Sequence, residues 1–571
     1  MVIEERIATS RECVKRTNAC EGQAFFARRE GNSYCVLHFP GNEKKDVFES
    51  AIKKKIDAGN FNFQGVWFPD SYCFRQAKFD EKVDFSSAVF NNHQSFSGSK
   101  FGSEAIFAGA TFKKEATFSG ATFSKKADFT SVVFHKDADF SSARFEAVGD
   151  FRNCLFMERA DFSRANFSIG SFWPATFNSS ASFYEARFQR ANFRVSEFKD
   201  TANFSYCSFG HAEFINTSFF KTADFFLASF EGQAYFTSAT FAEAVRFNMS
   251  TFNAEARFTS STFNGESDFS HSVLKSHVIF SGEYDNGGFG DGAYCDFRHT
   301  EFENPNLVSF HSVTLRPQWF VNVDCRRFEF TDVRWMGNLR REFIDEAVRD
   351  LTDRDAREER RAADRRAERR KQAELFFPYD ARALADLDNE DAEALARNAN
   401  AQRIRNRFLR LLSITCRQLA VNAEENHRYD EASEFRFWSM ELRRKEGMKA
   451  RGRLSVGALH SLYRYLSGYG EEIGRAFVIL VALWLFFSAL YTQVGFVPTE
   501  MSLQPSTYSN EGGSPQKLTK AVIYSLEVIT LQQPNPRPST PAARLAVVAE
   551  RILGPIQVAL LALAIRRRFI R

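Results

Sequence analysis

The sequence has very little net charge for its length. Its 75 Lys and Arg residues nearly balance 71 Asp and Glu residues, which leaves a formal net charge of +4 over 571 residues. A chain with balanced charge has no global field that attracts a polyanion, so composition gives no reason to expect a nucleic-acid partner. A chain of this length is also too long for one compact domain.

The sequence lacks an apolar leader and an ordered set of cysteines. Residues 1–11 contain no apolar run, so we expect no signal peptide. The nine cysteines show no even spacing that would indicate a disulfide framework; they stand at positions 13, 20, 35, 73, 154, 207, 295, 325 and 416. We therefore expect the large domains to lie in a reducing compartment.

The sequence also lacks an arrangement of residues typical of an enzyme. Its histidines are scattered, among them His38, His93, His135, His211, His271 and His277. No Ser/His/Asp set or pair of carboxylates stands out. The glycine-rich stretch 282–294 resembles neither a phosphate loop nor a dinucleotide-binding fingerprint. We therefore predict that the protein is not an enzyme.

Phenylalanine is the residue that the sequence has in excess, with 65 copies. Its steps alternate between five and six residues along Phe107, Phe112, Phe118, Phe123, Phe129, Phe134, Phe140, Phe145, Phe151, Phe156 and Phe162. A small residue, usually Ala, stands two positions before most of them, and such pairs share one side of an extended segment. A five-residue period fits neither a helix nor an ordinary strand. The chain must therefore turn a corner after each short strand, which predicts a β-solenoid with buried phenylalanines.

Individual repeats make this prediction more specific. Residues 127–131 (Ala-Asp-Phe-Thr-Ser) and 160–164 (Ala-Asp-Phe-Ser-Arg) resemble the A(D/N)(L/F)xx unit of pentapeptide-repeat proteins. The resemblance implies a right-handed, four-sided β-helix over residues 61–335, interrupted by a loop at 282–294. We interpret the extra residue in alternate steps as a bulge at a corner. Residues 61–283 would make on the order of ten turns, each rising by about 4.8 Å.

Some pentapeptide-repeat proteins mimic DNA and bind topoisomerases through acidic faces. Residues 61–283 contain roughly as many basic as acidic side chains, mixed along the whole repeat. A topoisomerase-binding DNA mimic is therefore the weakest of the functions that the resemblance suggests.

Residues 1–60 are expected to form an N-terminal cap with a zinc site. Cys35 and His38 have the Cys-x2-His spacing that brings a thiolate and an imidazole to one tetrahedral ion. Cys13 and Cys20 would complete the site, although their spacing is longer than usual. The alternative is three unrelated cysteines and a surface histidine. Apolar residues at helical spacing in 44–58 predict a helix that covers the first turn of the solenoid.

After the solenoid the composition changes to helix-forming residues. We expect a charged helical linker at 336–402, a helical hairpin at 403–447 and a basic juxtamembrane segment at 448–475. Residues 476–499 contain no charge and predict a transmembrane helix, and residues 541–565 predict a second one. Arg and Lys are abundant before the first span and after the second, whereas the loop between the spans carries few of them. The positive-inside rule then predicts a multi-pass protein of the inner (plasma) membrane with both termini and the solenoid in the cytoplasm.

Between the two spans, residues 518–531 predict an amphipathic helix too short to cross a bilayer. This order resembles the pore module of two-transmembrane potassium-type channels, as in bacterial membrane proteins that join pentapeptide repeats to a degenerate channel-like C-terminus. The resemblance implies a tetramer. The filter departs from that family, because no glycine occurs between Gly513 and Gly554. The residues expected to line a pore are Thr530, Leu531, Gln532, Gln533, Glu550 and Gln557.

The sequence leaves two functions open. One is an oligomeric ion channel-like pore gated by a cytoplasmic solenoid that senses or docks a partner. The other is a membrane-anchored protein-binding scaffold without conductance, in which the rod displays a surface for a cytoplasmic protein. The pore is slightly favoured, because an anchor does not need a re-entrant helix. Apart from one structural zinc, we expect no cofactor.

Overall fold

The computed structural model describes residues 13–15, 17–20, 25–70, 74–282, 288–290, 293–335, 390–447, 454–493, 496–497, 514–532, 537–538 and 540–569. Contacts divide the chain into two compact units, Met1–Gly337 and Asn338–Arg571, and each is described by itself. Gln533, Cys73, most of the predicted linker and parts of the loop at 282–294 and of the juxtamembrane segment lie outside the described residues.

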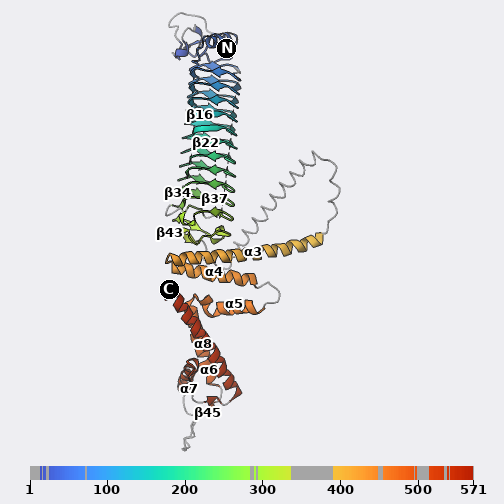
Figure 1. Ribbon diagram of the computed structural model, residues 1–571, viewed down its shortest axis with the longest axis vertical. Helices are drawn as coiled ribbons and strands as arrows, with labels where there is room; N and C mark the ends of the chain where they lie inside the picture. Colours follow the sequence, from blue (N-terminus) through green and yellow to red (C-terminus); the bar gives the residue numbers. More distant parts are fainter. Residues whose placement is uncertain are drawn as a thin grey trace, which may run out of the picture. The chain divides into compact units, whose positions relative to one another are not determined.

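The first unit is a β-solenoid of about 12 turns (Figure 1). Most strands have only two residues, and each pairs in parallel with the equivalent strands of the turns above and below it. One 10-stranded sheet runs from β3 (Trp67–Phe68) to β35 (Thr262–Phe263). A second runs from β7 (Gln94–Ser95) to β39 (Tyr294–Asp296), and a larger sheet contains β4 (Lys78–Phe79), β16 (Arg144–Asp150) and β43 (Glu329–Thr331).

The two step lengths of the repeat correspond to two kinds of corner. In the five-residue step after Phe107, the Ala110 N–H donates to the Phe107 carbonyl at 2.9 Å, and Gly109 has a φ of 67°. That is the geometry of a tight turn whose third residue needs a left-handed conformation. In the six-residue step after Phe112 the chain makes a wider bend. There the Lys113 N–H donates to the Phe90 carbonyl of the preceding turn at 2.9 Å. The extra residue therefore lies in a corner, as the sequence predicts.

The phenylalanines form stacked columns inside the solenoid. Phe129 lies face to face with Phe107 and Phe151, at centroid distances of 4.8 and 4.9 Å. It meets Phe140 of the neighbouring column edge to face, at 5.3 Å and 89°. The stacking distance equals the spacing of paired strands, so backbone and ring packing favour the same rise per turn.

The solenoid continues beyond the loop at 282–294, as the sequence predicts. Phe280 stacks on Phe310 at 5.1 Å, and Phe310 stacks on Phe330 at 5.5 Å. The ten turns expected for residues 61–283 did not include these later turns. The column continues past the loop at 282–294, as expected for a solenoid that extends to residue 335.

A small cap covers the first turn. It consists of η1 (Asn18–Cys20), the hairpin of β1 (Phe25–Arg29) and β2 (Asn32–Cys35), η2 (Asn42–Lys44) and α1 (Lys45–Asp57). Phe48 of α1 packs edge to face on Phe68 of β3, with ring centroids 5.6 Å apart. The predicted helix over 44–58 is therefore confirmed, together with its position on the first turn.

The second unit is helical. It contains α3 (Glu390–Glu425), α4 (Tyr429–Gly447), α5 (Leu454–Ser467), η5 (Gly468–Gly470), α6 (Ile473–Tyr491), α7 (Ser514–Ile529) and α8 (Pro541–Phe569), with β45 (Phe496–Val497) paired to β46 (Arg537–Pro538). α3 and α4 are antiparallel, because Ser413 bonds to Ser439 and Glu424 pairs with Arg436. α3 begins at Glu390, inside the segment predicted as a linker.

Two helices of this unit are long and apolar enough to cross a membrane. The most apolar 18 residues within 473–491 of α6 have a mean hydropathy of 2.2, and those within 541–567 of α8 have 1.7. α7 has 16 residues, fewer than the roughly 20 that span a bilayer. The three helices pack around one apolar cluster of Phe487, Tyr491, Ala521, Tyr524, Val528, Ala546 and Val547.

The stacked columns predict how the solenoid responds to loss of a ring. Phe162→Ala removes a buried ring that stacks on Phe140 and Phe183 at 4.9 and 5.0 Å. We expect the cavity to lower the free energy of unfolding by about 3–5 kcal/mol, measured by denaturant unfolding followed by circular dichroism. Phe220→Ala is the control, because Phe220 lies exposed on the same solenoid. Equal effects of the two substitutions would contradict the stacked core.

Candidate functional site

The four residues predicted to bind zinc lie together in the cap. The ligand atoms of Cys13, Cys20, Cys35 and His38 are all within 4.8 Å of one another. The Nδ1 of His38 lies 3.1 Å from the Sγ of Cys35, 3.2 Å from that of Cys20 and 3.6 Å from that of Cys13. Three thiols and one imidazole around one point are the donor set of a structural zinc site. The cluster could therefore hold a metal ion.

Two tight turns bring the four ligands together. Cys35 ends β2, and its carbonyl accepts from the N–H groups of His38 and Phe39, both at 3.1 Å. This turn places the Cys35 and His38 side chains on one side. The Cys20 N–H donates to the Thr17 carbonyl at 2.9 Å, so the short η1 turn folds Cys20 back toward Cys13. The unusual Cys13–Cys20 spacing is accommodated by that turn.

The outer nitrogen of His38 connects the cluster to the solenoid. Its Nε2 lies 2.8 Å from the carbonyl of Gln64, a residue of the first turn. Donation from Nε2 leaves the lone pair of Nδ1 directed at the thiols, which is how metal-binding histidines are commonly oriented. The Trp67 N–H also donates to the Leu37 carbonyl at 3.0 Å. A bound ion would therefore fix the cap on the end of the solenoid.

A buried lysine stands beside the cluster. Lys44 is fully buried; its ammonium donates to the Leu37 carbonyl at 2.6 Å and lies 4.5 Å from the centre of the Phe48 ring. Burial lowers the pKa of Lys44 to about 7, and the thiols of Cys35 and Cys13 oppose this shift. Burial and the nearby Cys13 raise the pKa of Cys35 to about 12. Three thiolates on Zn²⁺ carry one net negative charge, which an ammonium at Lys44 would balance.

The residues predicted to line a pore lie in two groups. Thr530, Leu531 and Gln532 are exposed at the end of α7. The Thr530 hydroxyl donates to the Leu526 carbonyl at 2.8 Å, and Arg551 Nη2 donates to the Gln532 carbonyl at 3.0 Å.

Glu550 and Gln557 are instead buried among the helices of their own chain. Glu550 of α8 accepts hydrogen bonds from the hydroxyls of Tyr491 in α6 and Ser525 in α7. Gln557 Nε2 donates to the carbonyls of Leu466 at 2.9 Å and Ala476 at 2.8 Å. Within one chain these two side chains join helices, and their exposure to a pore stays a prediction.

Sequence reasoning did not single out Tyr491 and Ser525. A hydroxyl in an apolar helix leaves no periodic signal, because Ser and Tyr occur on any face. The signal that could have found them is Glu550 itself, since a carboxyl in an apolar helix needs buried donors.

The geometry of the first unit defines a class of protein, the parallel β-solenoids with short strands and phenylalanine columns. A family model described as "Pentapeptide repeats (9 copies)" matches residues 74–122, 118–166, 129–176 and 225–273. The solenoid unit therefore contains pentapeptide repeats over these residues. Comparisons with curated proteins and with solved structures give no match.

The cluster predicts metal binding at a defined stoichiometry. We expect full-length protein purified in a reducing buffer to contain about one zinc per chain, measured by elemental analysis. Cys35→Ser should lose the zinc and lower the midpoint of thermal unfolding. Without the ion, His38 is held less firmly against the carbonyl of Gln64. Cys207→Ala is the control, because Cys207 is a buried thiol inside the solenoid. Zinc content unchanged in Cys35→Ser would contradict this site.

The bonds of Glu550 predict a structural role that stability can test. Glu550→Ala leaves two buried hydroxyls without their acceptor, which costs about 1–3 kcal/mol for each group. We expect a lower thermal midpoint of the detergent-solubilised protein, and a smaller effect of Glu550→Gln, whose amide oxygen still accepts. Glu527→Ala, less buried on α7, serves as the control. A carboxylate facing a water-filled pore would instead leave stability unchanged in all three variants.

Proposed function

We propose that the protein is a membrane-anchored scaffold whose solenoid displays a binding surface for a cytoplasmic protein. The observation that carries the proposal is a column of bulky side chains along one corner of the solenoid. We define the apolar corner as Tyr184, Tyr206, Phe226, Leu227 and Met249. Tyr206, Leu227 and Met249 stand on successive turns and are 45%, 38% and 46% exposed.

The aromatic side chains of the apolar corner contact one another along the solenoid. The ring of Tyr206 lies 5.5 Å from that of Tyr184 and 5.6 Å from that of Phe226. Together with Leu227 and Met249 on the following turns they form a column, unlike the scattered apolar residues found on any protein surface. Aromatic and methionine side chains are also the residue types enriched in protein interfaces.

The backbone conformation at this corner indicates that the bulky side chains of the apolar corner have a function. Tyr206, Leu227 and Met249 have φ values of 60°, 53° and 59°. Bulky residues rarely adopt this conformation, and the same corner carries Gly98 and Gly120 in earlier turns. Strained positions of this kind persist where the side chain serves another purpose.

Exposure of the apolar helices supports the membrane anchor. Only 17% of the apolar window of α6 and 22% of that of α8 is buried, whereas the core helix of a soluble protein is mostly buried. Large side chains on these helices are exposed, among them Phe477, Val478, Phe486, Leu545, Val548 and Ile552. A lipid bilayer is the surrounding that such faces require. The basic flanks support an orientation with both termini in the cytoplasm.

A pore is the second candidate, favoured by the position of α7. This short helix packs through Ala521, Tyr524 and Val528 against both candidate spans, and its end exposes Thr530 and Gln532. A two-helix unit lines only part of a pore, so conduction requires an oligomer, which we expect to be a tetramer. The bonds that Glu550 and Gln557 make within one chain favour the scaffold over the pore.

Photo-crosslinking in cells tests the scaffold. A photoreactive amino acid replaces Leu227 in the apolar corner or, as the control, Asn216, which has the same left-handed backbone at another corner. We expect one discrete protein adduct from position 227 that disappears in Tyr206→Ser/Met249→Ser, and none from position 216. Equal adducts from both positions would contradict the proposal. In planar bilayers, a conductance altered by Gln532→Ala would favour the pore instead.

A further inference from the structure

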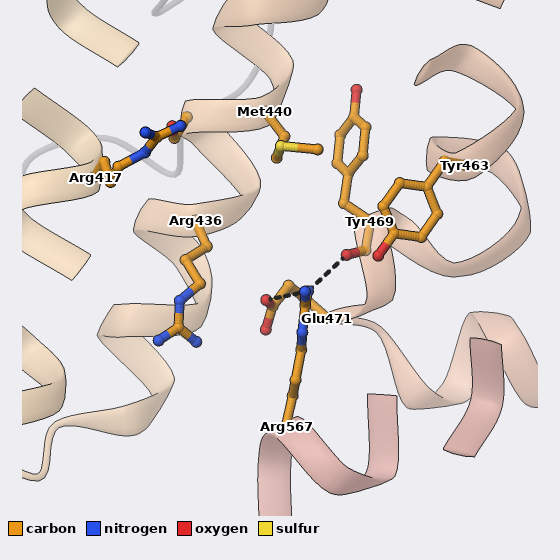
Figure 2. A pocket seen from close by; sticks show the side chains of 8 residues that line it. Arg417, Arg436, Met440, Tyr463, Tyr469, Glu471 and Arg567 are labelled. Carbon is orange, nitrogen blue, oxygen red and sulfur yellow. Dashed lines mark hydrogen bonds and ion pairs between the residues drawn. The ribbon is translucent and has the colours of Figure 1, made fainter. Parts of the chain in front are cut away.

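The second unit contains an arginine-lined cavity that neither candidate function uses. It has a volume of about 220 Å³ and lies among α3, α4, α5, η5 and the end of α8. Arg417 of α3 and Arg436 of α4 line one side, and Tyr463 and Tyr469 line the other (Figure 2). Arg567 of α8 closes the base beside Glu471.

The single carboxylate of the cavity already has its partners. Arg567 Nη1 lies 3.0 Å from Glu471 Oε1 and also donates to the Tyr469 carbonyl at 3.0 Å. The other oxygen of Glu471 accepts from the Ser433 hydroxyl at 2.7 Å. Glu471 therefore pairs with Arg567 and Ser433, and no bond joins it to Arg417 or Arg436 among the described residues.

The remaining arginines keep unused hydrogen-bonding capacity. Among the described residues no hydrogen bond or ion pair holds Arg417. Arg436 pairs with Glu424, but its Nη1 is buried without an acceptor in the part of the chain that the structure describes. Burial lowers the pKa of the neighbouring Arg443, and repulsion from Arg417 adds to the shift. The cavity therefore has a surplus of positive charge and donors.

These features match the chemistry of a phosphate group. Guanidinium groups present planar forks of donors that bind phosphate oxygens in pairs. The rings of Tyr463 and Tyr469, 5.7 Å apart, give the cavity an apolar wall for the group that carries the phosphate. The volume is below the roughly 300–1,000 Å³ of sites for drug-sized ligands, so the occupant is small.

We propose that this cavity binds a phosphate-bearing anion, held by Arg417 and Arg436. Its position favours the headgroup of an acidic phospholipid as the source. Glu471 stands two residues before α6 begins, and Arg567 lies in the last turn of α8, so the cavity lies where both apolar helices reach their polar ends. Basic pockets at this level of a membrane commonly bind lipid headgroups. A soluble phosphomonoester offers the same chemistry.

Binding to full-length protein in detergent tests the proposal. The probes are a short-chain phosphatidylinositol phosphate and inorganic phosphate, and the readout is the shift of the thermal midpoint with probe concentration. We expect Arg417→Gln to weaken binding at least about tenfold. Arg417 lacks a partner among the described residues, so this substitution leaves the helices intact. Arg417→Lys should restore part of the affinity, and the control Arg407→Gln, on an exposed position of α3, should retain it.

The two probes distinguish the sources of the phosphate. Tighter binding of the lipid, together with retention on vesicles that contain it, supports a headgroup site. Equal binding of inorganic phosphate without preference for such vesicles supports a site for a soluble phosphomonoester. Only the lipid experiment rests on the proposed membrane anchor. If the protein binds inorganic phosphate but shows no preference for the lipid, the anion site stands and only its lipid source is wrong. No binding of either probe, or equal binding by Arg417→Gln, would overturn the proposal.

Discussion

The spacing of hydrogen-bonded strands is the constraint on which the first unit depends. Phe129 stacks on Phe151 at 4.9 Å, a distance that suits both paired backbones and parallel rings. Alanine fits beside the rings because a larger side chain would push the turns apart. The exposed corner side chains take no part in this packing. Tyr206, Leu227 and Met249 can therefore present a surface without disturbing the core.

The two ends of the described chain use polar groups to join elements. At the cap, His38 connects the thiol cluster to Gln64, and the cap covers strands that would otherwise expose unpaired backbone. In the helical unit, Glu550 joins three helices through two hydroxyls. The side chains of His38 and Glu550 are both buried, and a buried polar group without hydrogen-bond partners destabilises the fold. Each of them therefore favours the one arrangement of its neighbours that supplies those partners.

The sequence predicted those parts of the structure whose residues recur at regular intervals along the chain. The solenoid followed from the period of its phenylalanines, and the grouping of three thiols and one imidazole from the spacing of Cys35 and His38. The last turns were predicted only as a looser repeat, because Phe280, Phe310 and Phe330 are not evenly spaced. The cavity could not be foreseen, because its side chains range from Arg417 to Arg567 and meet only in three dimensions.

Radical footprinting of native membranes tests most directly whether the apolar corner is a covered binding surface. Hydroxyl radicals oxidise exposed methionines, and mass spectrometry reports the rate at each site. Met249 lies in the apolar corner, whereas Met157 is exposed elsewhere on the solenoid and serves as the internal reference. The scaffold predicts slower oxidation of Met249 in membranes than in purified protein, with Met157 unchanged. Equal rates for Met249 in both samples would contradict it.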